Sequence, residues 1–192
     1  LRGAKGVPFS VARQCLAIDP LDESKLLSRI QGLRPAAVIV EPTNKENLLQ
    51  IQKMCRAHNV VFILDEIITG FRVSLTGCHG LWDIEPDLVC LGKAMANGYP
   101  LSAVMGRREI MSLAVECFIS STFGGETASL WAAKETIQIL EDMDYRQLWA
   151  IGNTIESFCE EEWWRPCSGY PGRPILTLPP GEHEDFQLHC ME

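Results

Sequence analysis

Two short apolar runs in the chain each end at residues that could do chemistry. The first, residues 60–64, is followed by Asp65 and Glu66, and the second, residues 87–91, leads through a glycine to Lys93. Apolar runs of this length that stop at a charged residue are typical of buried parallel strands. Ligands of open α/β sheets bind outside the carboxyl ends of such strands, so an acid and an amine delivered there could meet one ligand.

The amine of Lys93 is the candidate nucleophile. A lysine that apolar neighbours shield from water can form a Schiff base with a carbonyl compound, including the aldehyde of pyridoxal phosphate. Position alone favours a solvated surface lysine, but Asp65 changes the balance. The pyridoxal ring works as an electron sink only while its ring nitrogen stays protonated, and a carboxylate beside that nitrogen secures the proton. The alternative for Asp65 is a cap on a following helix.

A Mg²⁺-dependent ATPase is the main alternative function for Asp65-Glu66, because in such enzymes an apolar strand also ends in acids, and one of them holds the metal. That function requires the pattern Gly-x-x-x-x-Gly-Lys-Ser/Thr elsewhere in the chain. Around Lys93, Asp87 stands in place of the first glycine and Ala94 in place of the hydroxyl residue. The ATPase is therefore disfavoured.

A third candidate is the turn from Thr122 to Glu126, which precedes a clear helical pattern. Small residues and a hydroxyl ahead of a helix leave free N–H groups and the positive end of the helix dipole facing an anion, so a phosphate would suit this turn. The alternative is a tight turn in which Thr122 caps the helix.

The elements that would position these residues alternate between strands and helices. Hydrophobic periodicity predicts strands at 36–40, 60–64, 87–91 and 101–105, with a weaker signal at 14–18 and another strand at 175–178. It predicts helices at 22–30, 46–58, 127–143 and 145–163. The apolar stripes of the last two helices are expected at Leu130, Trp131, Ile137 and Leu140, and at Leu148, Ile151, Ile155 and Phe158. The pattern indicates an α/β fold with a subdomain boundary near residue 144.

Composition restricts the function classes. The 192 residues carry a net charge of −8 and no cluster of Lys and Arg, which argues against nucleic acid and anionic membranes as partners. No apolar run is long enough to span a membrane. The eight cysteines form no Cys-x-x-Cys pair, so a reducing, cytoplasmic compartment is expected. Cys55 and His58 lie one helical turn apart, but without a second pair at ligand spacing no metal site is predicted.

Four motifs, in order along the chain, resemble the class III pyridoxal-phosphate aminotransferases, and within them the glutamate-1-semialdehyde 2,1-aminomutase group. They are Asp65-Glu66-Ile67-Ile68-Thr69-Gly70-Phe71-Arg72, Pro86-Asp87-Leu88, Leu91-Gly92-Lys93-Ala94 and Thr122-Phe123-Gly124-Gly125-Glu126-Thr127. The resemblance extends from about Val7 to Trp149, and residues 169–178 are similar to the start of the family's small C-terminal domain. The chain begins at Leu1 and stops within a helical pattern, so we expect a piece of a longer protein.

The resemblance implies a fold type I enzyme with a mostly parallel sheet. Residues 1–143 would be part of the large cofactor-binding domain, and residues 144–192 a helical linker and the start of a small α+β domain. Lys93 would form the Schiff base and carry the proton between substrate and cofactor. Asp65 would pair with the ring nitrogen and Ile67 would pack on the ring. The family is usually a homodimer with shared sites, in which Thr122 would reach the phosphate of the partner's cofactor.

Two functions remain open at this point. The first is amino-group transfer from a small-molecule donor to a carbonyl acceptor, or isomerisation within one molecule. The segment after Glu41-Pro42 is short for the aminomutase group, so acceptors such as sugar or polysaccharide precursors fit equally well. The second is a truncated, inactive remnant or interaction module, because the family's N-terminal phosphate loop and ring-stacking aromatic residue are absent from this sequence.

Overall fold

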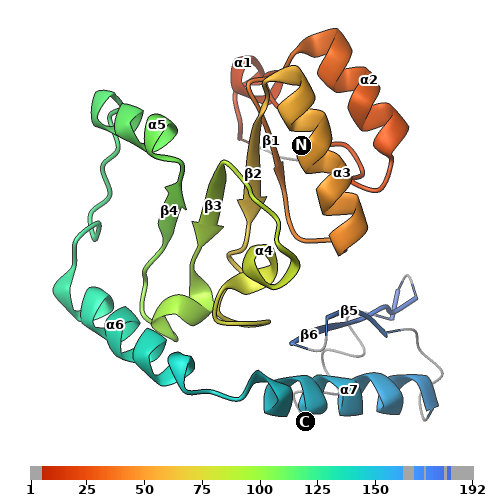
Figure 1. The fold of residues 1–192 in the computed structure, drawn as a ribbon, viewed down its shortest axis with the longest axis vertical. Helices are drawn as coiled ribbons and strands as arrows, with labels where there is room; N and C mark the ends of the chain where they lie inside the picture. Colours follow the sequence, from red (N-terminus) through yellow and green to blue (C-terminus); the bar gives the residue numbers. More distant parts are fainter. Residues whose placement is uncertain (1–5, 162–166, 171, 180, 183–192) are drawn as a thin grey trace.

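The protein was analysed as a computed structural model, which describes residues 6–161, 167–170, 172–179 and 181–182. A four-stranded sheet forms its centre (Figure 1). The strands are β1 (Ala37–Val40), β2 (Val61–Asp65), β3 (Leu88–Leu91) and β4 (Ala103–Gly106), adjacent in that order. β1, β2 and β3 are parallel, whereas β4 runs antiparallel to β3. The predicted mostly parallel sheet is therefore observed, with each of these strands displaced by no more than about two residues from its predicted range.

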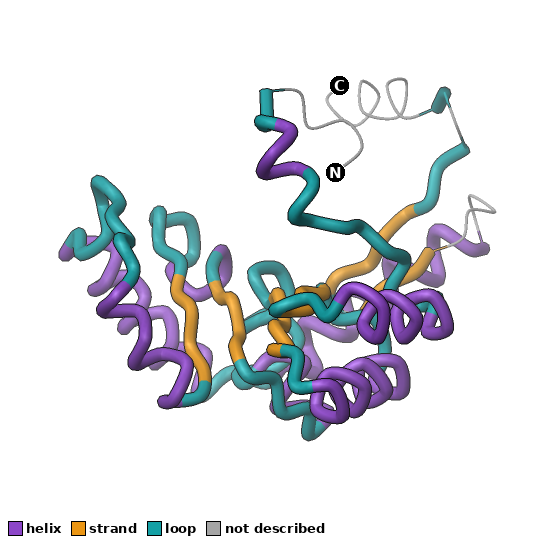
Figure 2. Tube along the Cα trace, turned by 90° about the horizontal axis from the view of Figure 1, so that it is seen from above, coloured by secondary structure: helices purple, strands orange, loops and turns teal. Residues whose placement is uncertain are grey.

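Helices connect and flank the sheet (Figures 1 and 2). The longer ones are α2 (Glu23–Leu33), α3 (Lys45–His58), α6 (Thr127–Glu141) and α7 (Tyr145–Glu161). The shorter ones are α1 (Phe9–Ala12), α4 (Gly77–Trp82), η1 (Lys93–Ala96), α5 (Arg108–Met111) and η2 (Ser112–Glu116). A hairpin of β5 (Cys167–Tyr170) and β6 (Arg173–Leu176) forms a separate two-stranded sheet, so the strand predicted at 175–178 lies two residues earlier. None of the helices among the described residues is long and apolar enough to cross a membrane.

The two faces of the sheet differ in how they are covered. Side chains alternate between the faces along each strand. The face that carries Phe62, Leu64, Val89 and Leu91 is buried under α2 and α3 at one end and under η1 and α6 at the other. The opposite face carries Ile39, which is 59% exposed, and half-buried residues that include Asp65. Among the described residues, one face of the sheet is thus the core and the other is open.

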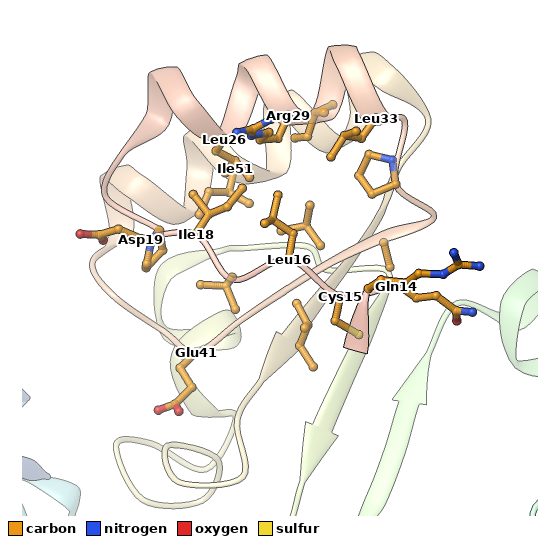
Figure 3. Close-up of a pocket in the computed structure, with 18 residues that line it drawn as sticks. Gln14, Cys15, Leu16, Ile18, Asp19, Leu26, Arg29, Leu33, Glu41 and Ile51 are labelled. Carbon is orange, nitrogen blue, oxygen red and sulfur yellow. The ribbon is translucent and has the colours of Figure 1, made fainter. Parts of the chain in front are cut away.

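The strand predicted at 14–18 is wrong for the described chain. Residues 15–19 have no regular secondary structure, and β1 pairs only with β2 among the described strands. Residues 13–20, α2 and β1 surround a mostly apolar cavity of about 660 Å³, with Leu16 and Ile18 between the helix and the strand (Figure 3). An apolar run becomes a strand only if a neighbouring strand accepts its backbone hydrogen bonds, and no described strand pairs with this segment.

The predicted apolar stripes of the last two helices are only partly correct. α6 buries Ser129 and Ala133 with its Ile137 partly buried, while Leu130 and Trp131 stay exposed. α7 buries Gly152 and Cys159, and Ile151, Ile155 and Phe158 are exposed. The amphipathic pattern predicted the positions of both helices, but their buried residues are small ones and not the large apolar residues of the predicted stripes. The subdomain boundary near residue 144 falls between α6 and α7 and stays a prediction.

Candidate active site

Asp65 and Lys93 lie at the same edge of the sheet. β2 and β3 are parallel neighbours, with Asp65 in register with Cys90 and the amide of Glu66 donating to the Cys90 carbonyl at 2.9 Å. Lys93 follows three residues later, just beyond the carboxyl end of β3. The structure therefore brings the predicted acid and amine to adjacent strand ends. Lys93 is exposed, and its φ of 42° is unusual for a residue other than glycine, a kind of backbone strain that concentrates at functional sites.

Ile67 lies beside the strand end that leads to Lys93. A Cβ added to Gly92 would meet the Ile67 Cγ2 at 3.6 Å, which puts the isoleucine side chain in contact range of the glycine before the lysine. The Ile67 amide donates to Asp65 Oδ1 at 3.1 Å, so Asp65 closes a short turn and caps no helix. Asp65 Oδ2 accepts no hydrogen bond from the described residues. One half-buried carboxylate, one amine and one apolar side chain at a single edge suit a flat cofactor with a basic ring nitrogen and an aldehyde.

Glu66 follows Asp65 in the sequence, and the pattern alone predicted no role for this residue. Its side chain is 0% exposed and accepts four hydrogen bonds. The donors are the Thr69 hydroxyl at 2.7 Å, the amides of Cys78 and His79 at 2.8 Å each, and the His79 Nδ1 at 2.7 Å. Burial alone would raise the pKa of Glu66, but these hydrogen bonds outweigh burial and hold the pKa below its ordinary value. The only sequence signal for this buried, hydrogen-bonded carboxylate is the position of Glu66 directly after an apolar strand and Asp65.

Asp87 of the Pro-Asp-Leu motif has a structural role. Its Oδ2 accepts the Phe62 amide at 2.8 Å, and its Oδ1 accepts Arg107 Nη1 at 3.0 Å. Its backbone amide donates to the Phe62 carbonyl at 2.8 Å. The motif therefore fastens the beginning of β2 to the beginning of β3, and Arg107 joins the end of β4 to both. This sets the register that places Asp65 and Lys93 at one edge.

Thr122 is not brought together with Asp65, Ile67 and Lys93. It is exposed in a turn ahead of α6, and it makes no hydrogen bond with the described residues. The loop between α5 and α6 runs along the far side of the molecule from β2 (Figure 1). Glu126 caps α6, with its carboxylate accepting the amides of Ala128 and Ser129 at 2.7 and 2.8 Å, so the alternative of Thr122 as the cap is wrong. The role of Thr122 toward a cofactor stays a prediction.

A cavity of about 610 Å³ opens beside Lys93. It lies between the segment after β2, the η1 region and the start of β6, and its charged lining residues are Arg72, Lys93 and Arg173. Arg72 Nε donates to the Gly172 carbonyl at 3.0 Å, and Arg173 Nη2 lies 3.3 Å from Glu41 Oε2. No acid lines this cavity although the chain as a whole is acidic. Asp65 and Ile67 are not among its lining residues, so the cavity adjoins their edge of the sheet without including it.

Comparison with known proteins agrees with this geometry. The family model of class III aminotransferases matches residues 24–157. The chain belongs to this family. Glutamate-1-semialdehyde 2,1-aminomutase of Aeropyrum pernix is 37% identical over 152 residues, which cover 71% of this chain and 35% of that protein. The corresponding enzyme of Methanothermobacter thermautotrophicus is 33% identical over 166 residues, 79% of this chain and 40% of that protein. The predicted family is confirmed, and the chain spans well under half the length of these curated relatives.

Solved structures confirm the predicted fold class. An omega-transaminase from Sphaerobacter thermophilus superimposes with a TM-score of 0.81 at 22% identity, covering 93% of this chain and 45% of that one. The ornithine aminotransferase of Toxoplasma gondii gives a TM-score of 0.75 at 26% identity, covering 84% and 43%. A transaminase solved with pyridoxal phosphate bound gives a TM-score of 0.78 at 22% identity, covering 91% and 46%. The chain therefore has the α/β fold type I architecture of these enzymes over the part that it spans.

Proposed function

We propose that the protein uses pyridoxal 5'-phosphate to move an amino group between two small molecules or within one. The observation that carries this proposal is the placement of Asp65 and Lys93 on neighbouring parallel strand ends in a class III aminotransferase chain. The relatives named above are aminotransferases and aminomutases, which supports both forms of the reaction.

Lys93, Asp65 and Ile67 would each have a separate role toward the cofactor. The amine of Lys93 would hold the cofactor through its aldehyde and would carry a proton to and from the substrate carbon. An Asp65 carboxylate oxygen would hold a proton on the ring nitrogen, and the Ile67 side chain would pack against the ring. When bound, pyridoxal phosphate supplies an electron sink for that substrate carbon. The basic cavity beside Lys93 suits a substrate that carries an acidic group.

We propose that Thr122 acts in a second copy of the chain. The segment around it exposes apolar side chains, with Val115 88%, Phe118 98%, Ile119 77% and Phe123 64% exposed. Exposed apolar residues gathered in one segment mark a surface that associates with another protein. In a homodimer this surface would be covered, and Thr122 would contact the phosphate in the partner's site. Light scattering should give a dimer mass, and Phe118→Ser should shift the mass toward a monomer.

Borohydride trapping tests the assignment of Lys93. Purified full-length protein is incubated with pyridoxal phosphate, reduced and digested, and the modified peptide is identified by mass spectrometry. The cofactor mass is expected on Lys93, to disappear in Lys93→Ala and to persist in Lys53→Ala, which removes an exposed lysine of α3. A label on another lysine, or an unchanged label in Lys93→Ala, would refute the assignment.

A catalytically inactive remnant or interaction module is the second candidate, favoured by the exposed apolar side chains. Titration of the 192-residue chain with pyridoxal phosphate separates the two. Saturable binding with a change in visible absorption supports the enzyme, and its absence supports the remnant. Glutamate-1-semialdehyde given alone then distinguishes isomerisation, which needs no second substrate, from transfer, which needs an acceptor.

A further inference from the structure

Glu66 stands between the two residues that the proposed function places on the cofactor. Side chains alternate along the end of β2, so Leu64 and Glu66 face the covered side of the sheet while Asp65 faces the open side. The backbone of Glu66 is also held, because its amide donates to Cys90 and its carbonyl accepts the amide of Gly70 at 2.8 Å. An anchored Glu66 therefore determines where Asp65 and the following Ile67 point.

The anchor is provided by residues distant in the sequence. Cys78 and His79 begin α4 and donate three hydrogen bonds to the Glu66 carboxylate. Gly77 packs so tightly that a Cβ there would lie 2.4 Å from Glu66 Oε2. On the other side, a Cβ on Gly70 would lie 2.6 Å from Leu91 Cδ2, two residues before Lys93. The turn at 66–70 is thus clamped between α4 and the end of β3.

A buried carboxylate with both oxygens satisfied is costly to disturb. Removing an acceptor leaves buried donors unpaired, and removing a donor leaves an uncompensated buried charge. Such a group holds one arrangement of the backbone around it more firmly than apolar packing does. Among the described residues, Glu66 is the one acidic side chain that is fully buried.

We propose that Glu66, with His79 as its side-chain partner, is a positioning residue that orients Asp65 and Ile67 toward the cofactor. This inference rests on the proposed function. Glu66 touches neither cofactor nor substrate and acts only through its neighbours in the chain. Because Glu66 is ionised, His79 must donate through Nδ1–H, and its imidazole is 27% exposed.

Other ionisable groups surround the Glu66–His79 pair. From α4, the Cys78 thiol lies next to Glu66, and burial, followed by the Glu66 charge, raises the pKa of that thiol to about 12. From the hairpin, Tyr170 and Arg173 are close enough to interact with Glu66 or Cys78. Burial raises the pKa of Tyr170, so its phenol stays neutral at ordinary pH. The Cys78 thiol likewise stays neutral at ordinary pH.

The test compares cofactor affinity among four variants of the full-length protein. Glu66→Gln keeps the side-chain size and removes the carboxylate, His79→Leu removes the Nδ1 donor, and His79→Asn keeps a donor that cannot become charged. Asp22→Asn is the matched control, because Asp22 also caps a helix with its carboxylate but lies at α2. The dissociation constant of pyridoxal phosphate is measured by tryptophan fluorescence, together with the pH dependence of the visible band and thermal unfolding.

We expect Glu66→Gln to weaken cofactor binding about tenfold, because about 1.4 kcal/mol of binding free energy would then be used to reorder Asp65 and Ile67. His79→Leu should weaken binding several-fold, and His79→Asn, which keeps a donor, should restore both the affinity and the visible band. Asp22→Asn should leave the affinity unchanged, because asparagine also caps a helix through its side-chain oxygen. If Glu66→Gln does not fold, the comparison of His79→Leu with His79→Asn decides the question.

Folded Glu66→Gln and His79→Leu proteins with the wild-type dissociation constant and visible band would overturn the inference and leave only a structural role. In that case borohydride would still label Lys93, and the proposed function would stand. If the wild-type protein neither binds pyridoxal phosphate nor is labelled on Lys93, the proposed function and this inference fall together.

Discussion

The substitution Gly77→Ala should be among the most damaging single-methyl additions in the chain. Gly77 has φ +66°, a left-handed backbone that costs a residue with a Cβ about 1–2 kcal/mol. The new methyl would lie 2.4 Å from Glu66 Oε2 and 2.8 Å from the carboxyl carbon, which is closer than atoms can approach. The carboxylate or the α4 backbone must therefore move.

That movement weakens hydrogen bonds to a buried charge. Glu66 Oε2 accepts the Cys78 amide at 2.8 Å and the Thr69 hydroxyl at 2.7 Å. A hydrogen bond to a charged group contributes about 1.5–3 kcal/mol. The loss of one such bond, added to the backbone strain, predicts that Gly77→Ala lowers the free energy of unfolding by about 2.5–5 kcal/mol.

Urea unfolding followed by circular dichroism measures this difference, with the midpoint and the slope compared for each variant. Gly98→Ala is the matched control, because Gly98 also has a positive φ, +105°, but no atom lies within 4 Å of the added Cβ. The control should cost only the backbone strain, about 1–2 kcal/mol. Equal losses in Gly77→Ala and Gly98→Ala would show that the contact with Glu66 contributes nothing and would refute the reasoning.

Three further outcomes follow from single features of the structure. Arg34 ends α2 with φ 47°, a conformation that favours glycine, so Arg34→Gly should raise the free energy of unfolding by up to about 1 kcal/mol. Arg29→Gly, inside the same helix, should lower it by about 1 kcal/mol, and urea unfolding measures both changes. A thiol reagent at pH 8 should modify the exposed Cys15 in the native protein, as read by mass spectrometry. It should react with Cys78 only after unfolding, because that thiol is buried and its pKa is raised to about 12. Rapid labelling of Cys78 in the native protein would contradict this. Because the pKa of Glu66 is lowered in the folded protein, its charge stabilises the fold above pH 4.5, and this contribution is lost as the pH falls through the lower folded pKa. The difference in the free energy of unfolding between wild type and Glu66→Gln, measured in urea, should therefore become smaller below pH 4.5. A difference that grows in acid would contradict the assignment.

Local chemistry in the sequence was sufficient to predict the four strands of the central sheet, the four longer helices and the residues at the strand ends. The apolar runs that precede Asp65 and Lys93 could be read as buried parallel strands, because they contain five and four apolar residues and are too short for a helix. Helix α3 was predicted to within one residue from its hydrophobic periodicity, and in the structure Asn44 and Asn59 cap its two ends. These features depend on near neighbours in the chain.

The tertiary structure decided what depends on residues far apart in the sequence. Glu66 is surrounded by donors 12 and 13 residues downstream, so no local pattern distinguishes it from a solvated acid. Residues 14–18 have a strand-like sequence but pair with no described strand, and β4 runs antiparallel although its apolar run resembles those of the parallel strands. On α6, the exposed Leu130 and buried Ser129 reversed the expectation from hydrophobicity, because the face that packs on η1 and the sheet carries Ser129, Ala133 and Ile137. Periodicity identifies which segments can form elements, whereas burial and pairing depend on which distant segments meet them.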